Sequence, residues 1–100
     1  MSIPHDLDIT IEMLRLLSKA PGGRMHCNDV YDSLARFFPQ LSHDEKTIPY
    51  QNSKSKWANV VQFARLHCVL MGFIYRPDEG VSRGYWKITE AGRGWLSKLK

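Results

Sequence analysis

Amide and hydroxyl side chains with useful hydrogen-bonding chemistry gather in the second half of the chain. Asn59 and Gln62 are three residues apart inside a run without Gly or Pro, which extends from Ser55 to Leu70. An amide can donate and accept at once, as the edge of adenine requires, so this pair predicts contacts with base edges in a DNA groove. Amides on a helix are more often merely solvated, and that alternative stays open.

Cationic side chains surround this pair. The candidates for phosphate contacts are Lys54, Lys56, Arg76, Arg83 and Lys87. Lys and Arg release counterions when they neutralise phosphates, and such contacts position a protein without reading sequence. Ser53 and Ser55 precede the long run, where hydroxyl and backbone N–H groups at a helix start can also take a phosphate. Tyr85 could stack on a sugar or base, although an exposed strand Tyr more often packs across a ribbon.

The charge distribution points the same way. The formal net charge is +4 at pH 7. Residues 1–50 carry five Lys and Arg against seven Asp and Glu, whereas residues 51–100 carry nine against three. A chain polarised in this manner can turn one face toward a polyanion. An ordinary solvated surface remains the alternative, so charge alone makes nucleic acid about an even choice.

Catalytic and metal sites have less support. The pairs His26-Cys27 and His67-Cys68 invite a zinc interpretation. Neighbouring side chains on a helix point about 100° apart, however, and the pairs lack the spacing of zinc ligands. No Ser-His-Asp order, glycine-rich phosphate loop or paired carboxylate near a base stands out. We therefore expect a protein that is not an enzyme and holds no metal or cofactor.

The remaining composition favours one domain in the cytoplasm. One hundred residues suit a single domain over residues 1–100, which buries roughly two thirds of its unfolded surface. No apolar run approaches the roughly 20 residues of a membrane span, and Met1–Asp6 lacks the basic start of a signal peptide. Cys27 and Cys68 lie far apart within apolar helical patterns, so we expect two buried free thiols.

Apolar spacing predicts the helices that must position these residues. They are expected near residues 4–19, 28–38, 54–71 and 89–99. Asn28 is the expected N-cap of the second helix, and Thr89 that of the last. Ser42 and Glu45 have capping-box spacing, which predicts a short helical turn near residues 42–47. The expected buried positions are Leu7, Ile9, Ile11, Met13, Leu14, Leu16, Leu17, Val30, Tyr31, Leu34, Phe37, Phe38, Trp57, Val60, Val61, Ala64, Cys68, Met71, Trp86 and Trp95.

A two-stranded ribbon is predicted after the long helix. Gly72 suits a left-handed helix cap because it has no Cβ. Alternating side chains predict strands near residues 73–76 and 84–88, joined by a turn-rich loop. The short segment Arg24-Met25-His26 could add an edge strand. The result is a mainly α, α+β chain with a small β-ribbon.

This order of elements is that of a winged helix-turn-helix, and residues 7–96 resemble the N-terminal winged-helix domain of Mrr-type restriction proteins. The resemblance rests on Phe63-Ala64-Arg65, where the family usually has Trp-Ala-Arg, on Gly72-Phe73-Ile74, and on the run from Arg83 to Arg93. It implies a DNA-binding, non-catalytic module, either a restriction-associated reader or a small transcriptional regulator. The long helix would then enter the major groove of double-stranded DNA, with the ribbon on the backbone.

Two departures limit what the resemblance carries. Val60 stands where the family often has Arg. The restriction proteins continue into a metal-dependent nuclease domain, and nothing after Lys100 supplies one here. We therefore expect DNA binding without cleavage, in an excised domain or a stand-alone protein. The alternative is a winged helix used for protein–protein contact or homodimerisation, which the acidic first half motivates.

Overall fold

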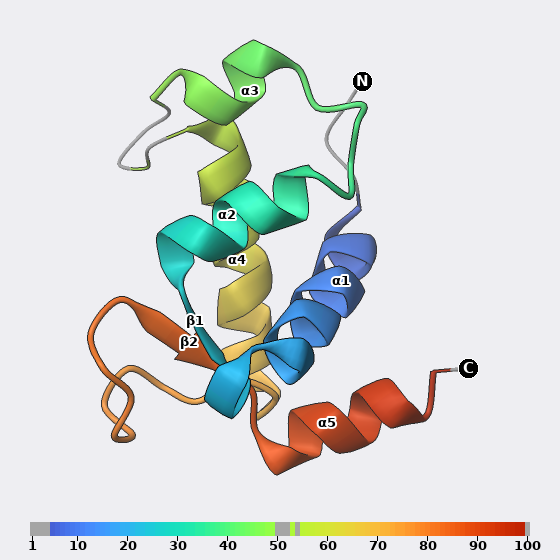
Figure 1. Cartoon of the computed structure of the whole chain (residues 1–100), viewed down its shortest axis with the longest axis vertical. Helices are drawn as coiled ribbons and strands as arrows, with labels where there is room; N and C mark the ends of the chain where they lie inside the picture. Colours follow the sequence, from blue (N-terminus) through green and yellow to red (C-terminus); the bar gives the residue numbers. More distant parts are fainter. Residues whose placement is uncertain (1–4, 50–52, 54, 100) are drawn as a thin grey trace.

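The computed structural model describes residues 5–49, 53 and 55–99, and their arrangement is shown in Figure 1. The elements in chain order are α1 (Asp6–Lys19), the 3-10 turn η1 (Pro21–Gly23), β1 (Arg24–His26), α2 (Cys27–Ala35), α3 (His43–Thr47), α4 (Lys56–Leu70), β2 (Tyr85–Lys87) and α5 (Glu90–Ser97). The chain is thus mainly helical with a two-stranded sheet, the winged-helix-like α+β architecture that the sequence predicts.

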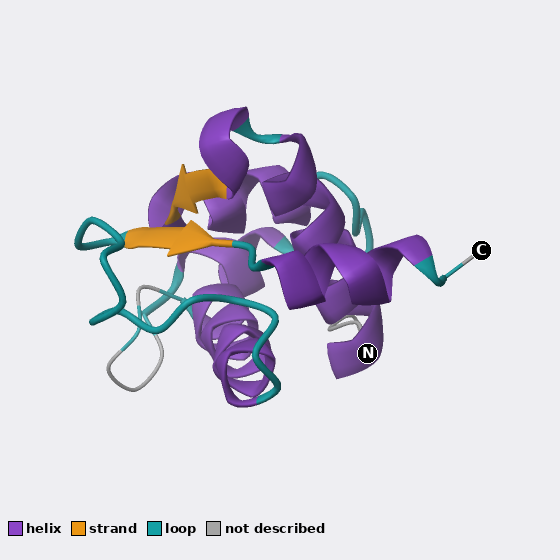
Figure 2. Cartoon of the chain, turned by 90° about the horizontal axis from the view of Figure 1, so that it is seen from below, coloured by secondary structure: helices purple, strands orange, loops and turns teal. Residues whose placement is uncertain are grey.

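Helix α4 is the central element of the packing. Helices α1, α2 and α3 all contact it, and α5 packs against α1. Figure 2 shows both strands on the side of the molecule away from the C-terminus. No helix in the described part of the chain is long and apolar enough to span a membrane.

The sheet joins segments from the two halves of the chain. Strands β1 and β2 pair antiparallel, with Arg24 opposite Lys87 and His26 opposite Tyr85, which confirms the predicted edge strand. The predicted strand over 73–76 is wrong, because this segment forms an isolated bridge between Ile74 and Ile88, with hydrogen bonds to the backbone of residues 87–89, rather than a regular strand. Its ladder ends early because the backbone N–H of Arg76 donates to the Glu79 carboxylate at 2.7 Å in a local turn.

The second helix is shorter than predicted, and its N-cap differs. It spans Cys27–Ala35 rather than 28–38, and the cap is His26, whose Nδ1 accepts the backbone N–H of Asn28 at 3.2 Å. The expectation of an Asn28 cap is therefore wrong. After Ala35 the chain continues in tighter turns, and Phe37, expected to be buried, is 54% exposed. A residue beyond the helix end no longer follows the helical stripe.

The other helix ends follow local capping chemistry. Helices α1, α4 and α5 each cover slightly less than predicted, beginning at Asp6, Lys56 and Glu90. Thr89 caps α5 as expected, through its side chain and the Gly92 N–H. The capping box between Ser42 and Glu45 is present in α3. These short-range predictions are confirmed because each depends on residues within one helical turn.

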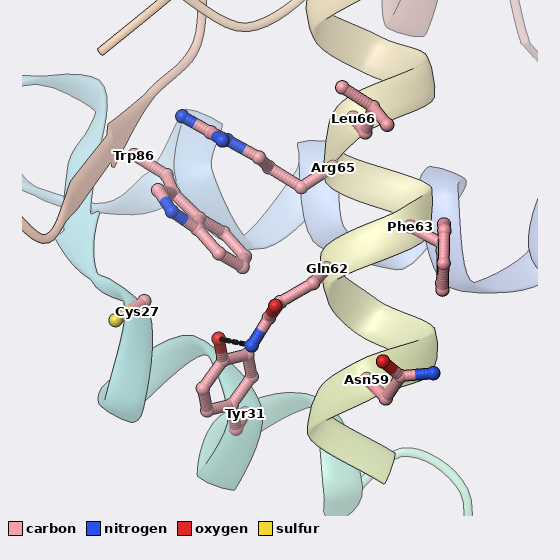
Figure 3. A pocket seen from close by; sticks show the side chains of 8 residues that line it. All are labelled: Cys27, Tyr31, Asn59, Gln62, Phe63, Arg65, Leu66 and Trp86. Atoms are coloured by element: carbon pink, nitrogen blue, oxygen red, sulfur yellow. Dashed lines mark hydrogen bonds between the residues drawn. The ribbon is translucent and has the colours of Figure 1, made fainter. Parts of the chain in front are cut away.

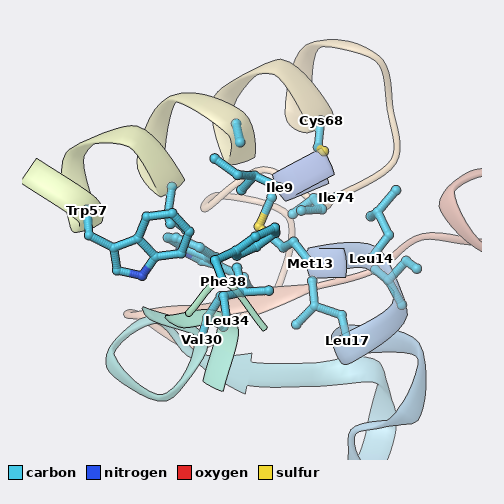
Figure 4. Close-up of a cluster of buried hydrophobic side chains, with 14 of the residues drawn as sticks. Ile9, Met13, Leu14, Leu17, Val30, Leu34, Phe38, Trp57, Cys68 and Ile74 are labelled. Atoms are coloured by element: carbon cyan, nitrogen blue, oxygen red, sulfur yellow. The ribbon is translucent and has the colours of Figure 1, made fainter. Parts of the chain in front are cut away.

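The core forms where α1, α2 and α4 meet, and Figure 4 shows its main side chains. It consists of Ile9, Met13, Leu14, Leu17, Val30, Leu34, Phe38, Leu41, Trp57, Val61, Ala64, Cys68, Ile74, Trp86 and Ile88. Besides Phe37, two residues expected there are exposed, Leu7 at 58% and Met71 at 60%. Leu7 lies beside the stripe formed by Ile9 and Met13, and Met71 follows the last residue of α4.

Both cysteines are free, as predicted, but only Cys68 is buried. Desolvation raises the pKa of the Cys68 thiol from its ordinary value to about 11. The proton is therefore held more tightly in the folded chain than in the unfolded one. Since the unfolded thiol ionises first, the free energy of unfolding should fall as pH rises from about 9 to about 11.

We expect a thiol reagent such as DTNB to modify Cys27 much faster than Cys68 at pH 8. The thiolate is the reactive species, so a pKa raised by about two lowers its population about 100-fold, and burial slows it further. The rates are measured on the single-cysteine variants Cys68→Ser and Cys27→Ser. Equal rates in the two variants, with both folded, would contradict the assignment of Cys68 to the core.

Candidate functional site

Two hollows meet beside α4, at the side chains of Arg65 and Trp86. The first, of about 410 Å³, is shown in Figure 3 and is lined by Cys27, Tyr31, Asn59, Gln62, Phe63, Arg65, Leu66 and Trp86. The second, of about 460 Å³, is lined by Arg65, Pro77, Val81, Ser82, Arg83, Gly84, Tyr85 and Trp86. We call the two together the α4 groove. None of the described residues lining it is an Asp or Glu.

Arg65 lies at the centre of the α4 groove. Figure 3 shows its side chain reaching from α4 across the indole of Trp86, and the guanidinium carbon is 5.5 Å from the ring centroid. Burial lowers the pKa of Arg65, although an arginine still carries its charge at neutral pH. Its Nε is buried without a hydrogen-bond partner among the described residues. No carboxylate in that part of the chain pairs with this cation.

Tyr31 forms the opposite wall of the first hollow. The edge of its ring meets Trp86, with centroids 5.7 Å apart, and its hydroxyl accepts a hydrogen bond from Gln62 Nε2 at 2.9 Å. Burial raises the pKa of Tyr31, so the phenol stays protonated at neutral pH. Its O–H can therefore donate to a further acceptor in the groove.

The two amides predicted to read base edges lie in the α4 groove and already make internal hydrogen bonds. Gln62 donates to Tyr31, and Asn59 Oδ1 accepts from the Ser53 hydroxyl at 3.1 Å. These bonds use the nitrogen of Gln62 and the oxygen of Asn59. Because an amide has a donor and an acceptor end, the same bonds orient the Gln62 oxygen and the Asn59 nitrogen.

The groove gathers four of the ten predicted site residues, namely Asn59, Gln62, Arg83 and Tyr85. The exposed side chain of Lys56 belongs to the first turn of α4, and Arg76 is exposed in the loop before β2. Lys87 leans over the ring of Tyr75, with 5.5 Å between Nζ and the ring centroid.

The hydroxyl predictions have different outcomes. Ser55 is 3% exposed, and its oxygen accepts the Ala58 N–H at 3.0 Å as the N-cap of α4. That oxygen therefore caps the helix and is buried. Ser53 is half-buried against Asn59. The predicted phosphate contact of Lys54 falls on a residue outside the described part of the chain.

Tyr85 packs across the strand pair, the alternative that the sequence left open. Its ring meets the edge of His26 at 5.3 Å between centroids, and Arg24 lies 5.5 Å over the same ring. It nevertheless remains 37% exposed and lines the groove. One face is thus used in packing while part of the ring stays accessible.

Sequence reasoning did not assign a binding role to Arg65, Tyr31 or Phe63. The structure shows the Arg65 guanidinium packed on Trp86. The available signal was its position three residues after Gln62, which places the two on neighbouring parts of one helical face. Phe63 is 51% exposed, so its aromatic ring is accessible on α4.

The run from Arg83 to Arg93 carries much of the family resemblance. Its C-terminal residues, from Thr89 onward, stabilise the fold and do not line the groove. Thr89 Oγ1 accepts the Gly92 N–H and donates to the Gly72 carbonyl. A Cβ at Gly92 would lie 2.4 Å from the Phe73 carbonyl oxygen. Arg93 Nη1 donates to the Ser18 carbonyl at 3.3 Å, which ties α5 to α1.

Comparisons with known proteins give one match. A family model described as the Mrr N-terminal domain matches residues 8–98. This range contains both the Phe63-Ala64-Arg65 triplet and the run from Arg83 to Arg93, so the resemblance inferred from these motifs is confirmed. Neither the search of curated proteins nor that of solved structures returned a match. The described residues contain no group of three or more His, Cys, Asp or Glu that could hold a metal ion.

Proposed function

Because the chain belongs to the Mrr N-terminal domain family, a restriction-associated module, we propose that it binds double-stranded DNA through α4 and the neighbouring loop. The role is non-catalytic, that of a reader or small regulator. Helix α4 enters the major groove and the loop before β2 follows the phosphate backbone, as in other winged helices.

The observation that carries the proposal is the α4 groove. Arg65 and Arg83 line it, and no described acidic residue does. A partly buried cation without a counter-ion favours a site that an anion will occupy, since the anion supplies the missing charge. The exposed cation Arg76 adds positive charge in the loop before β2, whereas Lys56 lies beside Asp44 and Glu45 of α3.

The amides of Asn59 and Gln62 are the proposed base-reading groups. They lie one helical turn apart on α4 and both line the first hollow. Their internal bonds to Ser53 and Tyr31 fix the side chains, which lowers the entropic cost of a contact with a base edge. Lys87 and Tyr85 are proposed to contact the sugar-phosphate backbone of the DNA.

Reversing Arg83, which lines the α4 groove, and Arg76, in the loop before β2, is expected to weaken DNA binding strongly. The variant is Arg76→Glu with Arg83→Glu, and its control is Arg36→Glu with Lys98→Glu, which changes the net charge equally. Arg36 and Lys98 are exposed at the ends of α2 and α5, away from the loop before β2 (Figure 1). With four or five phosphate contacts, the native log–log salt slope should be about −4, and losing two should reduce it by about 2.

Fluorescence anisotropy with a labelled duplex at several salt concentrations measures both quantities. We expect at least a tenfold loss of affinity for the Arg76→Glu, Arg83→Glu variant and less than a twofold loss for the control. Equal losses in the two variants would show that only net charge matters. Affinity that does not fall with salt would overturn the proposal.

A second candidate is protein–protein contact through the later part of α4. Phe63, Leu66, Leu70 and Met71 are 45–70% exposed, and such apolar exposure on one helix suits a partner surface. Light scattering distinguishes the two. Self-association that Leu70→Glu abolishes, in a protein that does not bind DNA, would favour the second candidate over the first.

A further inference from the structure

We infer that the α4 groove receives a single nucleotide that has left the base stack, with its base in the first hollow and its phosphate near Arg65 and Arg83. The inference rests on the proposed function and specifies the form of DNA that the groove accepts. A base inside a duplex presents only its edges. A hollow between α2 and α4 can admit a whole base only after that base is unstacked.

The shape of the first hollow fits an unstacked base. Its volume of about 410 Å³ lies within the roughly 300–1,000 Å³ range of small-ligand sites. Three aromatic residues, Tyr31, Phe63 and Trp86, are among those that line it, and Phe63 is the most exposed of the three. Aromatic walls bind bases through their faces with little regard to sequence.

Arg65 offers a planar surface as well as a charge. Its guanidinium is already held over Trp86, and a base can stack on the plane of a guanidinium as it does on an aromatic ring. The second hollow, which shares Arg65 and adds Arg83, suits the phosphates that flank the extruded base.

Polar groups at the rim match the edge of an unpaired base. The Tyr31 hydroxyl and the Gln62 oxygen provide a donor and an acceptor beside Trp86 (Figure 3). A base that has lost its partner exposes its Watson–Crick edge, which carries the complementary donors and acceptors. By contrast, Leu70, which is exposed further along α4 and outside the groove, is apolar and cannot hydrogen-bond to a base edge.

The test compares one labelled duplex with the same duplex carrying a single unpaired nucleotide. Because the unpaired base needs no further energy to unstack, we expect it to bind at least tenfold more tightly. A 2-aminopurine at the unpaired position should change its fluorescence on binding. The measured quantity for each variant is the ratio of the two affinities.

Two variants locate the nucleotide. Arg65→Gln and Phe63→Ala should each bring the ratio close to one, whereas Leu70→Ala, at an exposed position of α4 outside the groove, should leave it unchanged. Phe63 is half exposed, so its variant keeps the test valid if Arg65→Gln fails to fold. Circular dichroism checks the fold of all three.

The outcomes separate the two proposals. Salt-dependent duplex binding with a native ratio of one overturns the nucleotide site and leaves the proposed function standing. A raised ratio that persists in folded Phe63→Ala and Arg65→Gln also overturns it, because the nucleotide then lies elsewhere. Absence of binding to either DNA overturns both.

Discussion

Gly92→Ala should destabilise the protein by about 2 kcal/mol, within the 1–3 kcal/mol typical of overpacking. The added Cβ would lie 2.4 Å from the Phe73 carbonyl oxygen and 2.8 Å from Ile88 Cγ1. That carbonyl also accepts the Thr89 N–H at 2.9 Å, so the backbone cannot move away without weakening this bond. The loss should appear as a lower urea midpoint for unfolding.

Gly94→Ala is the matched control, in the same helix and two residues further on. Nothing lies within 4 Å of a Cβ built at Gly94. Replacing this glycine should therefore be neutral or stabilise the helix by up to about 1 kcal/mol. If the two variants had equal midpoints, α5 would be able to shift away from Phe73, and close packing would not explain Gly92.

Trp57→Ala should be the most damaging single substitution. The indole is 2% exposed, its Nε1 donates to the Tyr31 carbonyl at 2.9 Å, and its ring meets Phe38 at 5.8 Å between centroids. Removing a buried Trp side chain costs about 3–5 kcal/mol. Small domains are stable by only about 5–15 kcal/mol, so this substitution should remove at least about a fifth of the free energy of unfolding.

Trp57→Phe separates the ring from its hydrogen bond. Phe retains most of the packing but leaves the Tyr31 carbonyl without its donor. Trp57→Phe should therefore destabilise the protein by about 1–3 kcal/mol, less than Trp57→Ala does. Trp95→Ala, a partly buried indole stacked on Phe73, should cost less than Trp57→Ala. Thermal unfolding followed by far-UV circular dichroism ranks the three. A Trp95 variant less stable than the Trp57 variant would contradict the position of Trp57 in the core.

The sequence was most informative where a feature depends on near neighbours. The Ser42–Glu45 capping box, the Thr89 cap and the left-handed Gly72 are all present, with φ at Gly72 of 81°. Each involves chemistry within about one turn. The His26 cap was missed because its geometry depends on β1 turning directly into α2, which no local pattern reveals.

The predictions that failed needed contacts between distant segments. The strand expected over 73–76 has suitable residues and bonds to residues 87–89, but the Arg76 N–H turns to the Glu79 carboxylate and no regular strand forms. Leu7 fits a helical stripe as well as Ile9 does, and only the position of α4 decides between them. For the candidate site, amide and charge chemistry led to Asn59, Gln62 and Arg83, which line the α4 groove and whose contacts with DNA stay a prediction. The pairing of Arg65 with Trp86 joins α4 to β2 and could not be derived from spacing.

The bond from Arg93 to the Ser18 carbonyl also bears on how the chain reaches this structure. Strand β1 must wait for β2, which follows it only after α2, α3 and α4, and the end of α1 must wait for α5. The chain loses conformational entropy when such long loops close, before the stabilising contacts between their ends form, and this slows folding. On the ribosome, where the N-terminus emerges first, α1 and β1 must therefore remain without these partners until almost the whole domain has left the exit tunnel.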